Sequence, residues 1–571
     1  MGGCACRYAP FSPFALAWDL YPRRFFQSRQ RYPTCKGAEA MPDVFAEPVL
    51  TAQAMRAADQ HTIEVLGLPG RVLMETAGRA AAAVAAQMLG TVDGRTVICL
   101  CGRGNNGGDG FVLARVLHAQ GARVHVVTLS DVSSMSDDAA ANYQLLVHLA
   151  EADAENRLRL HRTESAAALD QLPPADVYVD ALLGTGLSSP LRTPLAEIVE
   201  WLNTRTAPVL AIDIPTGLHS DTGQVLGRAV RATRTVTMGA LKVGLLIGEG
   251  PKYCGKIEVA EIGIPRHVLV EAAQQAGCAW RATDTTIRHW LPRRAHDAHK
   301  YSAGLAIVVA GSREFTGAPV MAATAAARIG AGYVLCACPS GVRPILATKL
   351  TEVALLGLPE TERGGIDQED AFDVLANGLE RAQALLIGPG LGRHPDTQRF
   401  VRSLLERATQ PVVVDADGLN ALVGFTDLIR HHAQGRWILT PHAGEFRRLV
   451  GNDVDLTDRV RVVQQYARAW NCVLLLKGMP SLVGCPDGTV WINATGNPAL
   501  ATAGTGDILA GLCVGLLAQG LSPDRAALCA LHVGGAVADH YAAQAALQSM
   551  MAMDLLTHLP QVLRERFLQK A

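Results

Sequence analysis

One stretch near the start of the chain limits the fold more than any other. Residues 95–121 begin with the apolar run TVICLC, continue through a glycine-rich turn and end in a helix-like segment, and another apolar run follows at 123–129. This order predicts a strand, a helix and a second strand. Strands joined through a helix lie parallel in one sheet, and parallel sheets carry helices on their faces. The stretch therefore predicts an α/β fold.

The same pattern recurs along two parts of the chain. Further strands are predicted at 177–182, 209–214 and 235–238, and a second series of strands and helices begins near residue 304. A chain of 571 residues is too long for one hydrophobic core. We therefore expect two three-layer α/β sandwiches. They are a Rossmann-like domain over 49–265 and a second domain over 284–565, joined by a linker at 266–283.

Composition and charge exclude several classes of protein. Hydrophobic residues make up 49% of the chain and charged residues 18%, which is typical of a globular protein. The formal net charge of −1 provides no basic surface for nucleic acid or an anionic membrane. No apolar run is long enough to span a bilayer. We therefore expect a soluble protein without nucleic-acid or membrane partners.

The 13 cysteines show no pattern typical of a metal site. No C-x-x-C pair and no cysteine–histidine group with zinc spacing occurs. Cys99 and Cys101, and likewise Cys336 and Cys338, alternate within strand-like runs, so each pair should point to one buried face. Reduced core cysteines are typical of a cytosolic protein, and we expect a cytoplasmic location.

Residues 1–40 differ from the rest of the chain. They hold several arginines and few acids, as an organellar transit peptide would, but serine is sparse and no amphipathic period emerges. Met41 directly precedes sequence typical of a folded domain. We therefore predict a disordered or non-native extension, with a targeting segment as the alternative.

The segment 493–511, NATGNPALATAGTGDILAG, carries the clearest chemical signal. Gly504 and Gly506 allow close approach of the backbone to a ligand, and the helix predicted behind them offers N–H groups that favour a phosphate. A phosphate would repel Asp507 unless this residue takes a proton from a substrate hydroxyl. The alternative is a helix start that Asp507 merely caps. The surrounding NATGN favours a phosphoryl-transfer site.

A second glycine-rich loop, GRGNNGGDG, follows a strand in the first half and opens a helix, where such loops bind phosphate. Asn105 and Asn106 stand where GxGxxG has small residues, and their side-chain oxygens could bind a cation or ligand hydroxyls. Asp180, Asp213 and Thr216 add oxygen ligands at strand ends. Oxygen ligation suits a hard cation. Helix caps and turns are the competing explanation for each residue.

Four motifs of the first half, GNNGGDG, DALLGTGL, IDIPTG and MGALKVGLL, occur in this order in the NAD(P)H-hydrate epimerase family, which the chain resembles over about 49–265. The resemblance implies interconversion of R- and S-NAD(P)HX at C6 of the nicotinamide ring. It makes Asp213 the candidate acid/base, assisted by Lys242, and implies a potassium ion held by Asn106, Asp180 and Thr216. The implied contacts to the hydrate are Asn105, Asn106, Gly107, Gly108, Asp109, Gly184, Thr185, Gly186, Leu187, Ser188, Ser189, Pro190 and Asp213.

Motifs of the second half, among them GPGLG, DADGLN, LTPHAGEF and NATGNPALATAGTGD, resemble the ADP-dependent NAD(P)H-hydrate dehydratase family over roughly 284–563. The resemblance implies a ribokinase-like fold. It also implies that ADP phosphorylates the hydroxyl of S-NAD(P)HX, activated by Asp507, and that elimination yields NAD(P)H, AMP and phosphate. Mg²⁺ is expected with the nucleotide, although the sequence indicates no residue as its ligand. The implied contacts to the hydrate are Ala318, Gly390, Gly392, His442 and Asp507, and those to ADP are Lys477, Gly478, Met479, Pro480, Ser481, Gly504 and Gly506.

Two other functions remain open from the sequence. A ribokinase-like kinase for a sugar or vitamin precursor would release a stable phosphorylated product. A non-catalytic or RNA-processing scaffold could share the N-terminal fold, but the intact NNGGD loop, Asp180 and Asp213 disfavour it. The sequence ranks neither ADP against ATP nor NADHX against NADPHX as substrate. A homo-oligomer is expected because both families usually assemble.

Overall fold

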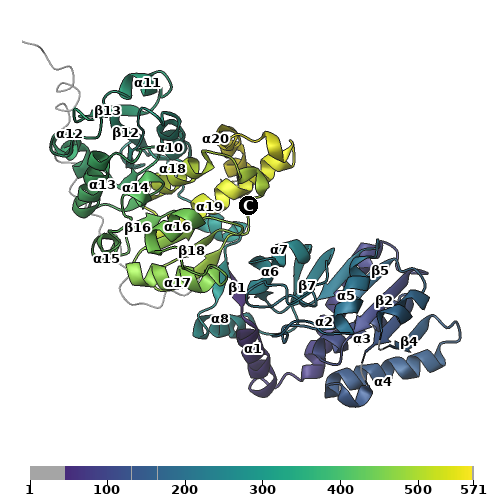
Figure 1. Cartoon of the computed structure of the whole chain (residues 1–571). Helices are drawn as coiled ribbons and strands as arrows, with labels where there is room; N and C mark the ends of the chain where they lie inside the picture. Colours follow the sequence, from purple (N-terminus) through teal and green to yellow (C-terminus); the bar gives the residue numbers. More distant parts are fainter. Residues whose placement is uncertain (1–44, 130, 164, 569–571) are drawn as a thin grey trace, which may run out of the picture. The chain divides into compact units, whose positions relative to one another are not determined.

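The computed structural model of this protein describes residues 45–129, 131–163 and 165–568. The predicted N-terminal extension, 1–40, lies outside these ranges. The described part contains a seven-stranded and a twelve-stranded sheet (Figure 1). No helix within it combines the length and apolarity that crossing a bilayer requires.

The seven-stranded sheet is parallel throughout, in the order β4-β3-β2-β5-β6-β7-β9. Its strands are β2 (Thr96–Cys101), β3 (Arg123–Thr128), β4 (Leu158–Arg162), β5 (Val177–Ala181), β6 (Val209–Ile212), β7 (Arg234–Met238) and β9 (Lys256–Ala260). The helices of this half are α1 (Ala52–Glu64), α2 (Gly70–Leu89), α3 (Asn105–Ala119), α4 (Asp137–Ala152), α5 (Leu195–Asn203), α6 (Val243–Leu246) and α7 (Gly250–Tyr253).

Strand β2 shows how this sheet is layered. Its side chains alternate between faces, so Cys99 and Cys101 share one hydrophobic cluster with helices α2, α3 and α4. Ile98 and Leu100 belong to a second cluster with Trp201 of α5. The sheet is thus covered on both faces, which confirms the α/β prediction and the shared face of the two cysteines. Because β2, β5 and β6 are parallel neighbours, the loops after them meet at one edge.

The twelve-stranded sheet has a parallel part and a mixed part. Its order is β13-β12-β11-β14-β15-β16-β17-β18-β19-β10-β1-β8, and it is parallel from β13 to β17. Its strands are β1 (Glu47–Leu50), β8 (Leu241–Lys242), β10 (Ala279–Arg281), β11 (Leu305–Val309), β12 (Tyr333–Pro339), β13 (Ala354–Leu358), β14 (Ala384–Ile387), β15 (Val412–Val414), β16 (Trp437–Leu439), β17 (Val473–Leu476), β18 (Leu482–Gly484) and β19 (Val490–Ile492).

The range 266–283, where the sequence predicted a linker, contains regular structure. It holds α8 (Arg266–Gln275) and strand β10, which pairs with β19 on one side and with β1 on the other. Strand β8 continues the same sheet beyond β1. These strands have only two to four residues, too few for the alternation that identifies a strand in a sequence.

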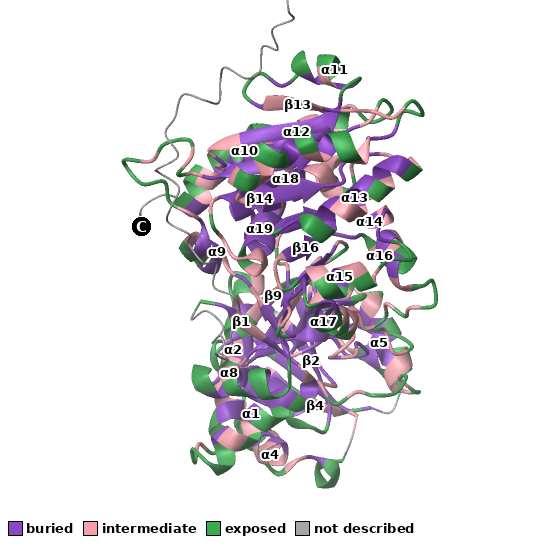
Figure 2. Ribbon diagram, turned by 90° about the vertical axis from the view of Figure 1, so that its left-hand side faces the viewer, coloured by how far each residue is buried: buried purple, intermediate pink, exposed green. Residues whose placement is uncertain are grey.

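Helices cover the twelve-stranded sheet on both faces. They are α9 (Asp284–Trp290), α10 (Gly317–Arg328), α11 (Arg343–Ala347), α12 (Gln368–Arg381), α13 (Pro395–Arg407), α14 (Asp417–Asn420), α15 (Asp427–His432), α16 (Ala443–Val450), α17 (Arg459–Trp470), α18 (Thr505–Ala518), α19 (Pro523–Ala542) and α20 (Ala552–Val562). Figure 2 shows the central strands β14 and β16 as buried.

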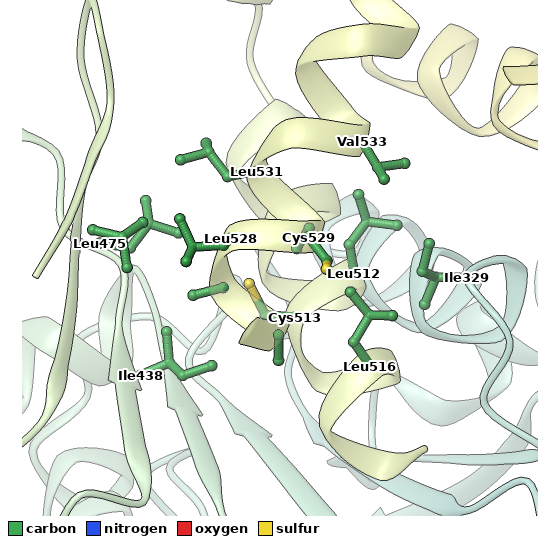
Figure 3. Packing of buried hydrophobic residues seen from close by; sticks show 14 of the residues in the cluster. Ile329, Ile438, Leu475, Leu512, Cys513, Leu516, Leu528, Cys529, Leu531 and Val533 are labelled. Carbon is green, nitrogen blue, oxygen red and sulfur yellow. The ribbon is translucent and has the colours of Figure 1, made fainter. Parts of the chain in front are cut away.

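Helix α18 is the most enclosed helix of this half, with only its first turn and one later residue partly accessible. Leu512 points toward Ile329, and Leu528 of the neighbouring α19 points toward Leu475 of β17 (Figure 3). A Cβ on Gly511 would collide with the carbonyl oxygen of Ala322 in α10. The glycine therefore allows α10 to pack closely against α18. The helix also contacts strands β11, β14 and β15, so it is held between α10 and the sheet.

Candidate active sites

The glycine-rich segment near the C-terminus forms the start of a buried helix, as the sequence predicted. Gly504 caps α18 with a φ of 92°, a left-handed conformation that favours glycine. A Cβ on it would lie 2.5 Å from Sδ of Met321, and a Cβ on Gly506 would lie 3.3 Å from Nζ of Lys477. An ammonium group thus lies at a helix N-terminus, and the two together favour an anion.

Lys477 forms an ion pair beneath this helix start. It follows β17, and its Nζ lies 2.9 Å from Oδ1 of Asp415, which follows β15. Thr440 donates a 2.8 Å hydrogen bond to the same carboxylate oxygen, and Oε2 of Glu445 lies 4.0 Å from Nζ. Burial disfavours the charged ammonium, but the carboxylates of Asp415 and Glu445 outweigh it and raise the pKa of Lys477. The lysine therefore stays charged.

Asp507 lies in the first turn of α18, and its surroundings shift the pKa of its carboxyl group. Burial and the nearby charge of Asp415 raise its pKa to about 7, against the opposing charge of Lys477. Asp417 and Glu445 contribute in the same direction as Asp415. A carboxyl that is half-protonated near neutral pH can both accept and return a proton. The arrangement therefore suits a general base beside an anion site.

His442 caps helix α16. Its Nδ1 accepts hydrogen bonds from the N–H groups of Gly444 (3.0 Å) and Glu445 (3.3 Å), and the Glu445 carboxylate accepts from the N–H of His442. These bonds fix the ring, whose side chain is 55% exposed. Because His442 and Lys477 also form a backbone bridge, the histidine lies beside the ion pair.

The glycines of the GPGLG loop form a close-packed wall. Gly390 has a φ of 61°, and a Cβ on it would lie 3.0 Å from the Cβ of Ala318. Gly392 has a φ of 73° and donates its N–H to Asp417 over 2.9 Å. The structure thus brings Ala318, Gly390 and Gly392 together. Asp417 connects this wall to Asp507, whose pKa it raises.

The predicted nucleotide loop, 477–481, turns back on itself after β17. The Ser481 hydroxyl accepts from the N–H of Gly478 (3.2 Å) and donates to its carbonyl oxygen (3.0 Å). Met479 is 64% exposed, an unusual position for a large apolar side chain. The loop therefore presents an apolar side chain next to the charged Lys477.

Some residues of this site were not singled out from the sequence. Asp415 and Asp417 stand in the DADGLN motif directly after a strand, and Glu445 stands in PHAGEF. Their positions within these motifs were the signal that could have identified them as site residues. Ser312 gave none. Its hydroxyl oxygen is buried without a hydrogen-bond partner in the described part of the chain. It lies 3.7 Å from the place of a Cβ on Gly392.

In the first half, Asn106, Asp180 and Thr216 meet at the edge of the seven-stranded sheet. Asp180 is fully buried and accepts from the hydroxyl (2.7 Å) and the N–H (2.8 Å) of Thr216. Burial raises the pKa of Asp180 to about 6, and these hydrogen bonds oppose it. Asn106 donates to the Leu183 carbonyl (3.1 Å), while its own Oδ1 is buried without a partner in the described ranges.

Asp213 follows β6 in a strained conformation, with a φ of 65°. Its Oδ1 lies 2.5 Å from Nζ of Lys242, a fully buried lysine. The same ammonium donates to the Met238 carbonyl (2.7 Å) and the Thr237 hydroxyl (3.0 Å). A strained residue held by a buried ion pair is typical of a functional site.

The loop 184–190 begins between these two groups. A Cβ on Gly184 would lie 3.6 Å from both Oδ2 of Asp213 and the Cβ of Asn106. The Thr185 carbonyl accepts from the Ser220 hydroxyl at 3.3 Å. The structure therefore brings the start of the loop to Asp213. The rest of it lies further out, with Leu187 partly buried and four exposed residues, Gly186, Ser188, Ser189 and Pro190.

Two more carboxyls belong to the surroundings of Asp213. Burial and the charge of Asp213 raise the pKa of Asp109 well above its usual range. Burial also raises the pKa of Asp59 to about 6, with Lys242 opposing and Asp213 adding to the shift. The sequence predicted Asp109 but missed Asp59, which lies in α1 far from every glycine loop. Asn105 is one turn before Asp109 and accepts from the Ser136 hydroxyl at 2.9 Å.

Comparison with known proteins shows which family the chain belongs to. A family model described as NAD(P)H-hydrate dehydratase matches residues 306–561, and one described as YjeF-related protein N-terminus matches residues 70–244. The bifunctional NAD(P)H-hydrate repair enzyme of Salinibacter ruber is 54% identical over 92% of this chain and 98% of its own length. The protein of the same name from Moorella thermoacetica is 40% identical over 90% of this chain and 96% of its own.

Among solved structures, the ADP/ATP-dependent NAD(P)H-hydrate dehydratase from Bacillus subtilis, co-crystallised with ATP and Mg²⁺, is 31% identical with a TM-score of 0.42. It matches 50% of this chain and 97% of its own. The matches to the curated relatives extend over nearly the whole of both chains, and they include both halves. The chain belongs to the family of bifunctional NAD(P)H-hydrate repair enzymes.

Proposed function

We propose that this chain repairs hydrated nicotinamide nucleotides. Its first half interconverts R- and S-NAD(P)HX, and its second half dehydrates S-NAD(P)HX to NAD(P)H with ADP as phosphoryl donor, giving AMP and phosphate. The observation that carries the proposal is the position of Asp507, a carboxyl with a pKa of about 7, beside Lys477 at the N-terminus of α18.

In the dehydratase half, each group has a role that its chemistry supports. Asp507 takes the proton of the C6 hydroxyl as that oxygen bonds to the β-phosphorus of ADP, and the bond to the bridging oxygen breaks to release AMP. Lys477 and the N–H groups from Gly504 to Gly506 stabilise the negative charge on the transferred group. Phosphate is a better leaving group than hydroxide, so it departs from C6 while C5 loses a proton.

The remaining predicted contacts complete the two ligand positions. Ala318, Gly390, Gly392 and His442 would hold the hydrate, because Gly392 bonds to Asp417 and forms one wall with Ala318 and Gly390, while His442 lies beside Lys477. The loop 477–481 would hold ADP, with Lys477 near its phosphates. Bound Mg²⁺ would neutralise phosphate charge, mostly through phosphate oxygens. In the described part of the chain, no group of three His, Cys, Asp or Glu is arranged to hold a metal.

In the epimerase half, Asp213 would take the proton of the C6 hydroxyl as the bond between C6 and the ring nitrogen opens, and would return it to the oxygen as that bond re-forms on the other face of C6. Lys242 holds the carboxylate in place through the ion pair, and the start of the 184–190 loop would lie over the nicotinamide. Asn105 to Asp109 would bind the nucleotide at the start of α3, where N–H groups favour phosphate. The exposed residues Ser188, Ser189 and Pro190 would contact the outer part of the ligand.

The groups near Asp180 fit a potassium ion. Oδ1 of Asn106 is buried and lacks a partner within the described ranges, and the Asp180 carboxylate and Thr216 hydroxyl supply further oxygens beside it. These are hard ligands. A bound potassium ion would supply a positive charge near the nucleotide phosphates. We further propose a cytoplasmic location, since the buried free cysteines of the described part suit a reducing compartment, and a homo-oligomeric state, as expected from the family.

One assay tests the function of both halves. A mixture of R- and S-NADHX is incubated with ADP, while the absorbance of reduced nicotinamide, AMP and phosphate are followed. We expect complete recovery of NADH with equal amounts of AMP and phosphate. A phosphorylated product that accumulates without NADH would support the ribokinase-like kinase instead. Recovery that stops when the S epimer is consumed would contradict the epimerase assignment.

A further inference from the structure

Arg459, the first residue of helix α17, reaches the loop 477–481 from a distant part of the sequence. Its Nη1 donates to the carbonyl oxygens of Pro480 (2.8 Å) and Met479 (3.4 Å), and its Nη2 lies 3.5 Å from the carbonyl oxygen of Leu476. One guanidinium group therefore binds the backbone on both sides of Gly478. No other side chain in the described part of the chain donates to these three carbonyls.

The contact with Gly478 shows that the guanidinium packs directly on the loop backbone. A Cβ on Gly478 would lie 2.5 Å from Nη2 and 3.1 Å from Cζ of Arg459, too close for a real side chain. A side chain at this position would therefore displace the guanidinium from the loop. The Ser481 hydroxyl bonds from the other side of the loop, to the N–H and carbonyl of Gly478.

Arginine suits this position for two reasons. Its planar fork carries five N–H donors and can bridge several carbonyl oxygens, whereas a lysine ammonium is a compact group on a flexible stem. No carboxylate of the described residues pairs with Arg459, so its hydrogen bonds go to the loop. Helix α17 holds the arginine in place, because the Asp458 carboxylate caps the helix at the N–H of Arg461 (3.0 Å).

We propose that Arg459 is a positioning residue for the nucleotide: it sets the shape of the loop 477–481 and thereby presents Lys477 and the loop backbone to ADP. The proposal rests on the proposed dehydratase function and assigns part of its ADP affinity to a residue outside every motif of the sequence. The hydrate lies against other elements, so losing the Arg459 contacts should weaken ADP binding and spare hydrate binding.

Steady-state kinetics of the full-length protein test this. Arg459→Ala should raise the KM for ADP about tenfold or more, the effect of losing hydrogen bonds from a charged donor. Its kcat should also fall, because Lys477 loses its position beside the transferred group, whereas its KM for S-NADHX should stay within about twofold. Arg459→Lys should fall between Arg459→Ala and the parent, because the compact ammonium cannot reach all the carbonyl oxygens that the guanidinium fork bridges. Arg461→Ala on the exposed side of the same helix is the matched control and should leave all three constants unchanged.

A double-mutant cycle with Gly478→Ala separates positioning from general damage. In the parent, the new Cβ displaces the guanidinium and should raise the KM for ADP as Arg459→Ala does. In the Arg459→Ala background the collision is absent, so the second substitution should cost only the backbone strain at Gly478 (φ 159°) and add less than it costs in the parent. Additive effects, or equal rises in KM for ADP and for S-NADHX, would overturn the proposal.

These experiments distinguish loss of folding, and failure of the proposed function, from failure of the positioning role of Arg459. If Arg459→Ala does not fold, the lysine variant and the Gly478→Ala variant still report the KM for ADP. If the parent restores no NADH, the proposed function fails. The shift of melting temperature with ADP then tests Arg459 alone. An equal ADP-induced shift in the parent and in Arg459→Lys would contradict the positioning role.

Discussion

Lys477 and Asp415 form a buried ion pair of 2.9 Å directly beneath the first turn of α18. Each follows a strand of the parallel part of the twelve-stranded sheet, and 62 positions separate them in the chain. The pair holds a positive charge where a transferred phosphoryl group would lie. It also affects the protonation of Asp507, since the two charges act on that carboxyl in opposite directions.

Replacing Asp415 and replacing Lys477 should shift the pH dependence of dehydration in opposite directions. Asp415 raises the pKa of Asp507 and Lys477 lowers it. In Asp415→Asn the acid limb of kcat/KM should therefore move to lower pH, and in Lys477→Met it should move to higher pH. Both variants should lose activity by at least about tenfold, because breaking a buried pair leaves one charge uncompensated. Shifts of the same sign in pH–rate profiles would contradict Asp507 as the titrating base.

Asp507→Asn should lose the dehydratase activity and make the folded protein more stable at pH 8. The pKa of Asp507 is raised from 3.8 to about 7 in the folded protein, so the folded state binds more protons than the unfolded state between these values. Stability from this group therefore falls as pH rises through that range. The amide removes the penalty, and we expect a melting temperature about 2–4 °C higher at pH 8 but unchanged near pH 3. Scanning calorimetry at both pH values checks this, together with loss of dehydration.

Substitution at Asp213 should separate the two activities. Asp213→Ala should abolish turnover of R-NADHX and leave that of S-NADHX intact, because the dehydratase residues lie on other elements. Lys242→Met should do the same and also lower the stability by roughly 3 kcal/mol, since Asp213 loses its buried partner. Assays with the isolated epimers and ADP measure both effects. Normal processing of both epimers by Asp213→Ala would contradict the assignment of the epimerase site.

Thr216 offers a matched pair of variants for the potassium proposal. Thr216→Ser keeps the hydroxyl beside Asp180, whereas Thr216→Val removes it with little change in size. Epimerisation by the serine variant should keep the parent's dependence on potassium concentration. The valine variant should need at least about tenfold more potassium, because it loses one oxygen ligand, a loss comparable to that of one hydrogen bond to a charged group. Equal potassium dependence in all three proteins, measured against sodium as control, would exclude Thr216 as a ligand.

Much of the architecture could be predicted because its signals are local. The apolar run of β2, the glycine turn and helix α3 are continuous in the chain, so their order alone predicts a parallel unit. The start of α18 was predictable for the same reason. The short strands β1, β8 and β10 were missed, because a strand of two to four residues acquires its hydrogen bonds only from partners far away in the chain.

The residues of the candidate sites were predicted or missed for the same reason. Gly504, Gly506 and Asp507 were predicted because a phosphate loop needs small residues at fixed spacing. Asp59 was missed because it lies on a helix that carries no motif, and Ser312 because a serine in a loop has many ordinary uses. Their roles depend on which side chains lie next to them across the fold.

The sequence by itself therefore determined the α/β class, the glycine loops and the residues within them, since all of these depend on local backbone requirements. Only the tertiary structure decided that Asp415 faces Lys477, that Lys242 is buried against Asp213, and that Arg459 packs on Gly478. Charge and burial act through space, so the protonation of Asp507 and the shape of the nucleotide loop depend on contacts between residues far apart in the chain, and no pattern along the chain shows those contacts.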